Sequence, residues 1–118
     1  MPETFRDYLP LTEATFYILL SMALERKHGY AILKDVQALS QGQVVLSTGT
    51  LYGALSRLLD QSLIERVEEE DPAQVARPRK FYTLTRLGRR VLEAEMERLR
   101  VLAATARQRL AQSEGWIR

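Results

Sequence analysis

The fold of this chain is decided by one stretch, Ser47-Thr-Gly-Thr-Leu-Tyr-Gly-Ala-Leu-Ser-Arg-Leu-Leu59. Its leucines share one face at helical spacing, whereas Thr50, Gly53 and Arg57 fall on the opposite face. Ser47 or Thr48 can cap this helix, because a side-chain oxygen at that position accepts a first-turn N–H. The stretch therefore predicts a helix that buries its leucines and presents a polar face carrying small residues, hydroxyls and an arginine.

Two helices are expected before this stretch. Residues 1–10 form a short arm, and Thr12 is a plausible cap for a mostly buried helix that runs to about Lys27. After a turn at His28-Gly29, a second helix runs from about Tyr30 to Leu39, and Ser40 to Gln43 stop it. This second helix is expected to bury Ile32, Leu33, Val36 and Leu39. A short β-prone run, Val44–Leu46, then leads into the decisive stretch.

A β-hairpin is expected after the third helix. Leu63 to Glu69 alternates as a half-exposed strand does, and Asp71-Pro72 breaks it. Phe81 to Thr85 pairs back after a polar loop of about ten residues. Three helices followed by a hairpin predict a mainly α fold with a small β-hairpin (α+β), namely a winged helix-turn-helix.

The last predicted helix begins after Thr85 and continues to roughly Gln112. At about 1.5 Å per residue, its ~28 residues extend ~40 Å, farther than a core of this size can cover. Its first two turns can fold back on their own domain, but the remaining apolar face needs a second chain. The heptad seam that predicts a homodimer consists of Leu92, Met96, Leu99, Ala103, Ala106 and Leu110, with Val91 and Leu102 widening it. The expected organisation is a DNA-binding domain with its N-terminal arm over residues 1–84 and a dimerisation helix over 85–118.

Charge is distributed unevenly along a chain of net charge +2. Six basic and no acidic residues lie between Arg77 and Arg90, whereas Glu65 to Asp71 holds five acids. A basic block beside a polar helix favours double-stranded DNA as partner, although a solvated surface is the plainer alternative. Cysteine is absent, no apolar run is long enough to cross a bilayer, and the N-terminus is unlike a signal peptide, so we expect a cytoplasmic protein without membrane contact.

The polar face of the third helix supplies the expected DNA contacts. Arg57 can read a guanine edge, and Thr48, Thr50 and Tyr52 stand where hydroxyls hold a phosphate. The structural alternatives are simple capping for Ser47 and Thr48, and a solvent-exposed surface position for Arg57 and Lys34. The residues expected to contact DNA are Tyr30, Lys34, Ser47, Thr48, Gly49, Thr50, Tyr52, Arg57, Arg77, Arg79 and Lys80.

No pattern in the chain predicts an enzyme. His28, the single histidine, has no readable catalytic partner and is expected to start a helix. Metal-ligand spacing, a phosphate-binding glycine loop and a nucleophile–base pair are all missing from the sequence, so no cofactor and no metal are expected. The acids from Glu68 to Asp71 are expected to be a solvated turn.

Several motifs, in order, resemble the PadR-like transcriptional regulators over about residues 11–90. They are His28-Gly29-Tyr30-Ala31-Ile32, Ser47-x-Gly49-Thr50-Leu51-Tyr52-x-Ala54-Leu55-x-Arg57-Leu58, Leu63-Ile64 and Arg79-Lys80-Phe81-Tyr82-x-Leu84-Thr85-x-x-Gly88. The resemblance implies a homodimeric winged-helix repressor of the short subfamily, which has a single C-terminal helix that crosses to the partner. It also implies that a phenolic acid or planar cationic drug releases DNA in some members.

Two positions depart from the family pattern. Gly53 stands where the family usually has proline. Because glycine lowers helix stability, we expect a looser start of the third helix in this chain. Trp116 lies beyond the heptad seam, whereas the drug-sensing relatives carry a tryptophan midway along the last helix. If a small aromatic effector exists, its expected lining is Phe16, Tyr17, Met96 and Trp116, which are equally candidates for plain core.

Two other functions remain open at this stage. The winged helix can alternatively be a protein-interaction module that binds no DNA. The acidic run Glu68 to Asp71 favours this alternative, because it would repel phosphate if the tip of the hairpin entered a DNA groove. The dimer can alternatively carry a small molecule without binding DNA. The operator, the target genes and the direction of regulation cannot be inferred from the sequence.

Overall fold

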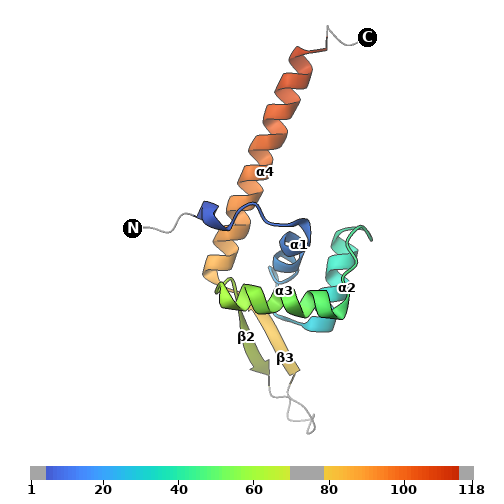
Figure 1. The fold of residues 1–118 in the computed structure, drawn as a ribbon, viewed down its shortest axis with the longest axis vertical. Coiled ribbons are helices and arrows are strands. Elements are labelled where there is room, and N and C mark those ends of the chain that lie inside the picture. The colour runs from blue at the N-terminus through green and yellow to red at the C-terminus, as the bar shows by residue number, and fades with distance from the viewer. Residues whose placement is uncertain (1–4, 70–78, 115–118) are drawn as a thin grey trace.

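The computed structural model describes residues 5–69 and 79–114. Three helices are followed by two strands and a long fourth helix, the order expected for a winged helix-turn-helix. The elements are η1 (Phe5–Tyr8), α1 (Glu13–Ser21), β1 (Lys27–His28), α2 (Gly29–Leu39), α3 (Thr48–Asp60), β2 (Ile64–Glu69), β3 (Arg79–Leu84) and α4 (Arg86–Gln112). Figure 1 shows α4 projecting away from the other helices, with β2 and β3 at the opposite end of the molecule.

Side-chain caps begin the longer helices. The hydroxyl of Thr12 accepts the N–H of Thr15, and Thr85 and Ser47 cap α4 and α3 in the same way. His28 caps α2 by accepting the N–H of Ala31 at Nδ1, 3.3 Å away, which confirms its expected role at a helix start. Each cap satisfies a first-turn amide that has no acceptor inside the helix.

The core lies where α1, α2 and α3 meet the sheet and the first turns of α4. Of the four leucines expected to share the buried face of α3, Leu51, Leu55 and Leu58 are buried, and Leu59 is half-buried at the edge of the core. The buried hydrophobic residues are Ile18, Leu19, Met22, Ile32, Val36, Leu51, Ala54, Leu55, Leu58, Leu63, Ile64, Tyr82, Val91 and Leu92. Leu39, also expected in the core, is the last residue of α2 and is 41% exposed.

The prediction that the first helix continues to about Lys27 is wrong. α1 ends at Ser21, and the chain then turns through residues that include Leu24, which is 95% exposed. Lys27–His28 instead forms β1, which pairs antiparallel with β3. The sheet therefore has three strands in the order β1-β3-β2 rather than the two of a simple hairpin. The β-prone run Val44–Leu46 forms no strand.

A close approach at Gly88 seats α4 on the start of the hairpin. A Cβ at Gly88 would collide with the carbonyl oxygen of Leu63. Beside it, the Thr85 hydroxyl donates to the carbonyl of Ser62 at 2.7 Å. The glycine and the cap together fix where α4 leaves the sheet, so the direction of the long helix follows from this contact.

Candidate nucleic-acid interface

The outer face of α3 is polar and exposed. Thr48, Gly49, Thr50 and Arg57 are exposed, while the leucines behind them are buried. The Ser47 hydroxyl accepts the N–H of Thr50 at 3.1 Å and donates to the Thr50 hydroxyl at 2.9 Å. The predicted cap is thus present, and a polar ridge begins at a helix N-terminus, where amides and hydroxyls can meet phosphate oxygens.

The side chain of Arg57 folds back along α3. One guanidinium nitrogen lies 3.8 Å from the place where a Cβ of Gly53 would be. Arg57 also lines a small pocket of about 180 Å³ with Tyr8 and Gln61, between the N-terminal segment and α3. Its charge therefore lies on the outer surface of the second half of the helix.

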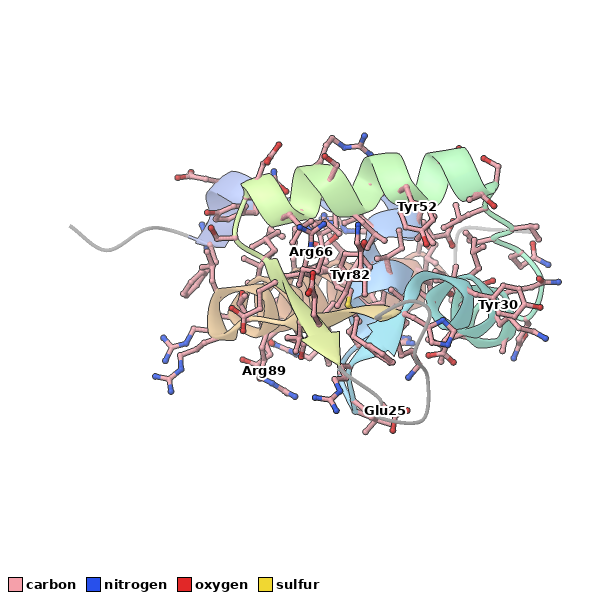
Figure 2. The ribbon with its side chains drawn as sticks, turned by 90° about the horizontal axis from the view of Figure 1, so that it is seen from below. Glu25, Tyr30, Tyr52, Arg66, Tyr82 and Arg89 are labelled. Carbon is pink, nitrogen blue, oxygen red and sulfur yellow. The ribbon has the colours of Figure 1, made fainter. Side chains whose placement is uncertain are left out.

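Tyr52 is held at the junction of α3, α2 and the sheet. Its hydroxyl occupies the space in which Gly29 lacks a Cβ, and its side chain remains 46% exposed. The hydroxyl therefore points toward α2, at the start of that helix. Tyr30 lies farther along, 64% exposed, with the Lys34 ammonium 5.4 Å from its ring centroid (Figure 2).

The structure divides the basic block that the sequence shows as continuous. Lys80 is exposed on β3, opposite Glu68 in the strand register. Arg79 forms the first position of β3, and Arg77 lies outside the described residues. Arg89 donates to the carbonyl of Ala23 at 3.3 Å, on the side of the sheet away from α3 (Figure 2). The basic residues that follow β3 thus do not all serve one surface.

Two residues near α3 were missed by the sequence analysis. Tyr82, on β3, is only 5% exposed, and Arg66 lies directly opposite it on β2. Burial raises the pKa of the Tyr82 hydroxyl, Tyr52 raises it further, and Arg66 partly offsets both through its charge and a side-chain hydrogen bond. Figure 2 shows Tyr52, Arg66 and Tyr82 gathered between α3 and the strands. Only the strand register, which the sequence does not state, reveals this group.

The seam predicted along α4 is solvent-exposed from its second member onward. Met96, Leu99 and Leu110 are 52%, 42% and 64% exposed, and Ala103 and Ala106 are also exposed. Leu92 must be removed from the seam, because it packs into the core of its own chain and is 4% exposed. The apolar stripe that lacks a partner within the chain therefore begins one turn later than predicted.

A buried carboxylate joins α4 to the N-terminal segment. Glu95 is 2% exposed and accepts the N–H of Leu11 at 3.1 Å. It also receives two hydrogen bonds from Arg98, at 2.6 and 2.9 Å. The pKa of Glu95 is lowered, first by the hydrogen bonds from Arg98 and further by the Leu11 amide and the Arg98 charge, against burial, which raises it. The spacing of Glu95 matches no recognisable motif, so the sequence alone does not point to this residue.

The predicted effector lining is only partly assembled. Phe16 and Tyr17 meet edge to face at 5.9 Å between ring centroids on α1. Met96 is exposed on α4, and Trp116 lies outside the described residues. A groove of about 870 Å³ does lie beside α4, but it is lined by η1, the following loop and α4, with Leu9 and Leu102 among its residues.

Nothing in the described part of the chain resembles a metal centre, since no group of three or more His, Asp or Glu residues is suitably placed. None of the described helices combines the length and apolarity that a membrane span requires.

The chain is similar to several known proteins. It is 32% identical to the transcriptional regulator YqjI of Escherichia coli (strain K12) over 90 residues, which are 76% of this chain and 41% of that protein. An uncharacterized 37.1 kDa protein in transposon TN4556 of Streptomyces fradiae is 37% identical over 83 residues, 70% of this chain and 22% of that one. The chain thus spans less than half the length of these curated relatives.

Solved structures share the fold. A PadR family transcription regulator from Clostridium difficile R20291 superposes with a TM-score of 0.69 at 26% identity, covering 84% of this chain and 99% of that one. Bacillus subtilis PadR in complex with operator DNA gives a TM-score of 0.61 at 21% identity, covering 70% of this chain and 46% of that one. The model of the transcriptional regulator PadR-like family matches residues 18–94. With its helices, three-stranded sheet and long last helix in the same arrangement, the chain belongs to the PadR-like family of transcriptional regulators.

Proposed function

We propose that this chain binds an inverted-repeat DNA operator as a homodimer and acts as a repressor. The observation that carries the proposal is the exposed polar face of α3, which lies at the surface while its leucines anchor it in the core. A structure of this fold with operator DNA, that of Bacillus subtilis PadR, supports the choice of ligand. A helix of these dimensions fits the major groove, and two-fold symmetry would place two copies in successive grooves.

Within this proposal, each part of the surface has a different role. Arg57 reads a base edge, because its guanidinium lies on the outer surface of α3. The first turn of α3 fixes the helix on the DNA backbone through its amides and hydroxyls. The residues that we assign to backbone contacts are Tyr30, Lys34, Ser47, Thr48, Gly49, Thr50, Tyr52, Arg77, Arg79 and Lys80.

The second half of α4 is the proposed dimerisation element, within a segment of residues 85–118 that follows a DNA-binding region of residues 1–84. Every residue from 99 to 112 is exposed within its own chain, and Leu99, Val101, Leu102 and Leu110 are all more than 40% exposed. An apolar stripe of this length that its own chain leaves exposed favours a partner chain. The groove between η1 and α4 lies beside the same helix, and its apolar residues offer a surface on which the partner helix can pack.

DNA binding is tested by footprinting on the region upstream of the gene and by titration at several salt concentrations. We expect protection of two half-sites about one or two helical turns apart. Affinity should fall steeply with salt, because each phosphate contact releases counterions. Absence of binding to any duplex at low salt would refute the proposal and favour a protein-interaction module.

The dimer is tested by sedimentation of Leu99→Arg, with Gln108→Arg as the matched control. Both positions are exposed on α4, but Gln108 lies off the apolar stripe. We expect Leu99→Arg to sediment as a folded monomer and the control to remain a dimer. A dimeric Leu99→Arg variant would contradict the assignment of the interface.

We further propose that a small aromatic effector bound between α1 and α4 of the dimer relieves repression. Phe16, Tyr17, Met96 and Trp116 remain the candidate lining for this site. Such a ligand can act only if it prefers the dimer that does not fit DNA. Fluorescence titration with aromatic compounds, with and without DNA, tests this idea, and equal affinity for free and DNA-bound dimer would rule it out.

A further inference from the structure

An arginine on β2, Arg66, is exposed beside α3 and has a defined register position. Arg66 is directly opposite Tyr82 in the β2–β3 register, so the two side chains share the face of the sheet that α3 covers. Tyr82 is buried at 5% exposure, and Tyr52 from α3 lies against the same group. Because the Tyr82 ring is buried, it limits the positions that the Arg66 guanidinium can adopt.

The partner of Arg66 is neutral. Burial, and then Tyr52, raise the pKa of the Tyr82 hydroxyl above its ordinary value, so the phenol carries no charge near neutral pH. Arg66 lies opposite this neutral phenol in the strand register, so the phenol neighbours the guanidinium without cancelling its positive charge.

Other arginines in the molecule contrast with this one. Arg98 and Arg100 each form a two-point hydrogen-bonded pair with a carboxylate one turn earlier on α4. In the described part of the chain, no carboxylate forms an ion pair with Arg66. Glu68 lies on the same face of β2 and faces Lys80 across the register. With respect to the described residues, Arg66 thus keeps donors and charge for a ligand outside the chain.

We propose that Arg66 binds a DNA backbone phosphate between α3 and β2, and that Tyr82 is the positioning residue that holds it there. This inference rests on the DNA-binding function proposed above and adds a contact that none of the residues assigned there supplies. A planar guanidinium can donate two parallel hydrogen bonds to a phosphate, and the phenol uses only part of its donor set. Located between the recognition helix and the hairpin, the contact would fix the angle at which α3 enters the groove.

The test uses the full chain and a mixed-sequence duplex of about 30 base pairs, roughly three helical turns. Fluorescence anisotropy over a range of salt concentrations gives the affinity and the slope of log K against log salt. The variants are Arg66→Ala, Arg66→Lys and Tyr82→Phe. Arg89→Ala is the matched control, because it removes the same charge on the side of the sheet away from α3.

We expect Arg66→Ala to weaken binding to all sequences alike, by about tenfold, and to reduce the salt slope by about one unit for each DNA-bound protomer. Arg66→Lys should keep the slope but recover only part of the affinity. Arg89→Ala should change neither quantity appreciably. If Arg66→Ala behaves as Arg89→Ala does while the wild type binds DNA, the inference is wrong and the DNA-binding function stands. If the wild type binds no duplex, the DNA-binding function itself fails.

The role of Tyr82 is tested by a double-mutant cycle. Tyr82→Phe should lower affinity with an unchanged salt slope, and it should have no further effect in the Arg66→Ala background. Melting temperatures of all variants separate loss of folding from loss of binding. Equal effects of Tyr82→Phe in both backgrounds would show that the tyrosine does not act through Arg66.

Discussion

Replacing Glu95 by glutamine tests how α4 is joined to the N-terminal segment. The carboxylate accepts three hydrogen bonds, two from Arg98 and one from the Leu11 amide, in a site where it is 2% exposed. Glutamine keeps the shape but has one acceptor oxygen, and its amide group opposes the donors of Arg98. The lowered pKa of Glu95 indicates that the folded chain favours the ionised form over a neutral one, despite the cost of burial.

The expected loss of stability follows from these contacts. A hydrogen bond to a charged group contributes about 1.5–3 kcal/mol to stability. Because Arg98 is partly exposed to solvent, its two hydrogen bonds contribute less than this. We therefore expect Glu95→Gln to lower the free energy of unfolding by about 2 kcal/mol. For a domain of this size, that corresponds to a decrease of about 8 °C in Tm.

The assay is thermal unfolding at a fixed protein concentration, because dimerisation makes the Tm concentration-dependent. Glu97→Gln is the internal control. Glu97 forms the same kind of pair with Arg100, but the two side chains are 62% and 66% exposed, so its loss should leave the Tm unchanged. If Glu95→Gln and Glu97→Gln melt at the same temperature, the buried carboxylate does not stabilise the contact between α4 and the N-terminal segment.

The pH dependence of the same pair gives a second check. The folded-state pKa of Glu95 is below its unfolded value, so its contribution is complete above the ordinary glutamate pKa of about 4.3. It is lost as the pH falls through the lowered, folded-state value. The gap in stability between wild type and Glu95→Gln should therefore be constant between about pH 6 and 8 and narrow below about pH 4.

Substitutions at three further positions test the frame around α3. Gly29→Ala places a methyl group where the Tyr52 hydroxyl lies, so the ring must swing away; we expect weaker DNA binding by anisotropy with a Tm change below about 4 °C. Gly88→Ala drives a Cβ into the backbone carbonyl of Leu63, which cannot move aside, and should cost about 3 kcal/mol in chemical denaturation, whereas a loss near zero would contradict the close approach. Ser47→Ala should cost about 1 kcal/mol through loss of the cap and Ser47→Gly only a few tenths, an order that side-chain contacts other than capping would not produce.

Local chemistry explains the parts of the fold that the sequence predicts well. The caps at Ser47 and Thr85 and the end of α4 at Gln112 are where they were expected. Each depends on residues within one turn of the boundary, so no knowledge of the rest of the chain is needed. The family resemblance is confirmed by the match over residues 18–94.

The end of α1 depends on distant residues instead. The apolar sequence through Leu24 favours a continuing helix, but that side chain is 95% exposed in the turn after Ser21. The chain leaves the helix because Lys27 and His28 complete the sheet against β3, more than fifty residues later. Burial of an apolar pattern is a local expectation, whereas a strand pairing is a property of the assembled molecule.

The charged residues that were missed share this cause. Glu95 falls among exposed glutamates of α4, and nothing in its spacing shows that the N-terminal segment will pass over it and offer the Leu11 amide. Arg66 lies in an acidic strand, where the sequence suggests a solvated position. Its significance comes from Tyr82, which the hairpin register places opposite it.

Both residues therefore become informative only when their partners are known. A carboxylate such as Glu95, whose partners lie within the chain, is a structural joint. Arg66 has a neutral partner that orients it and no carboxylate partner among the described residues, so it retains the charge and the donors that an external anion requires. A structural charge and a DNA-binding charge thus differ in whether a partner within the chain pairs with them after folding. The salt slope of DNA binding tests this difference directly. Only an arginine that contacts phosphate changes the number of counterions released.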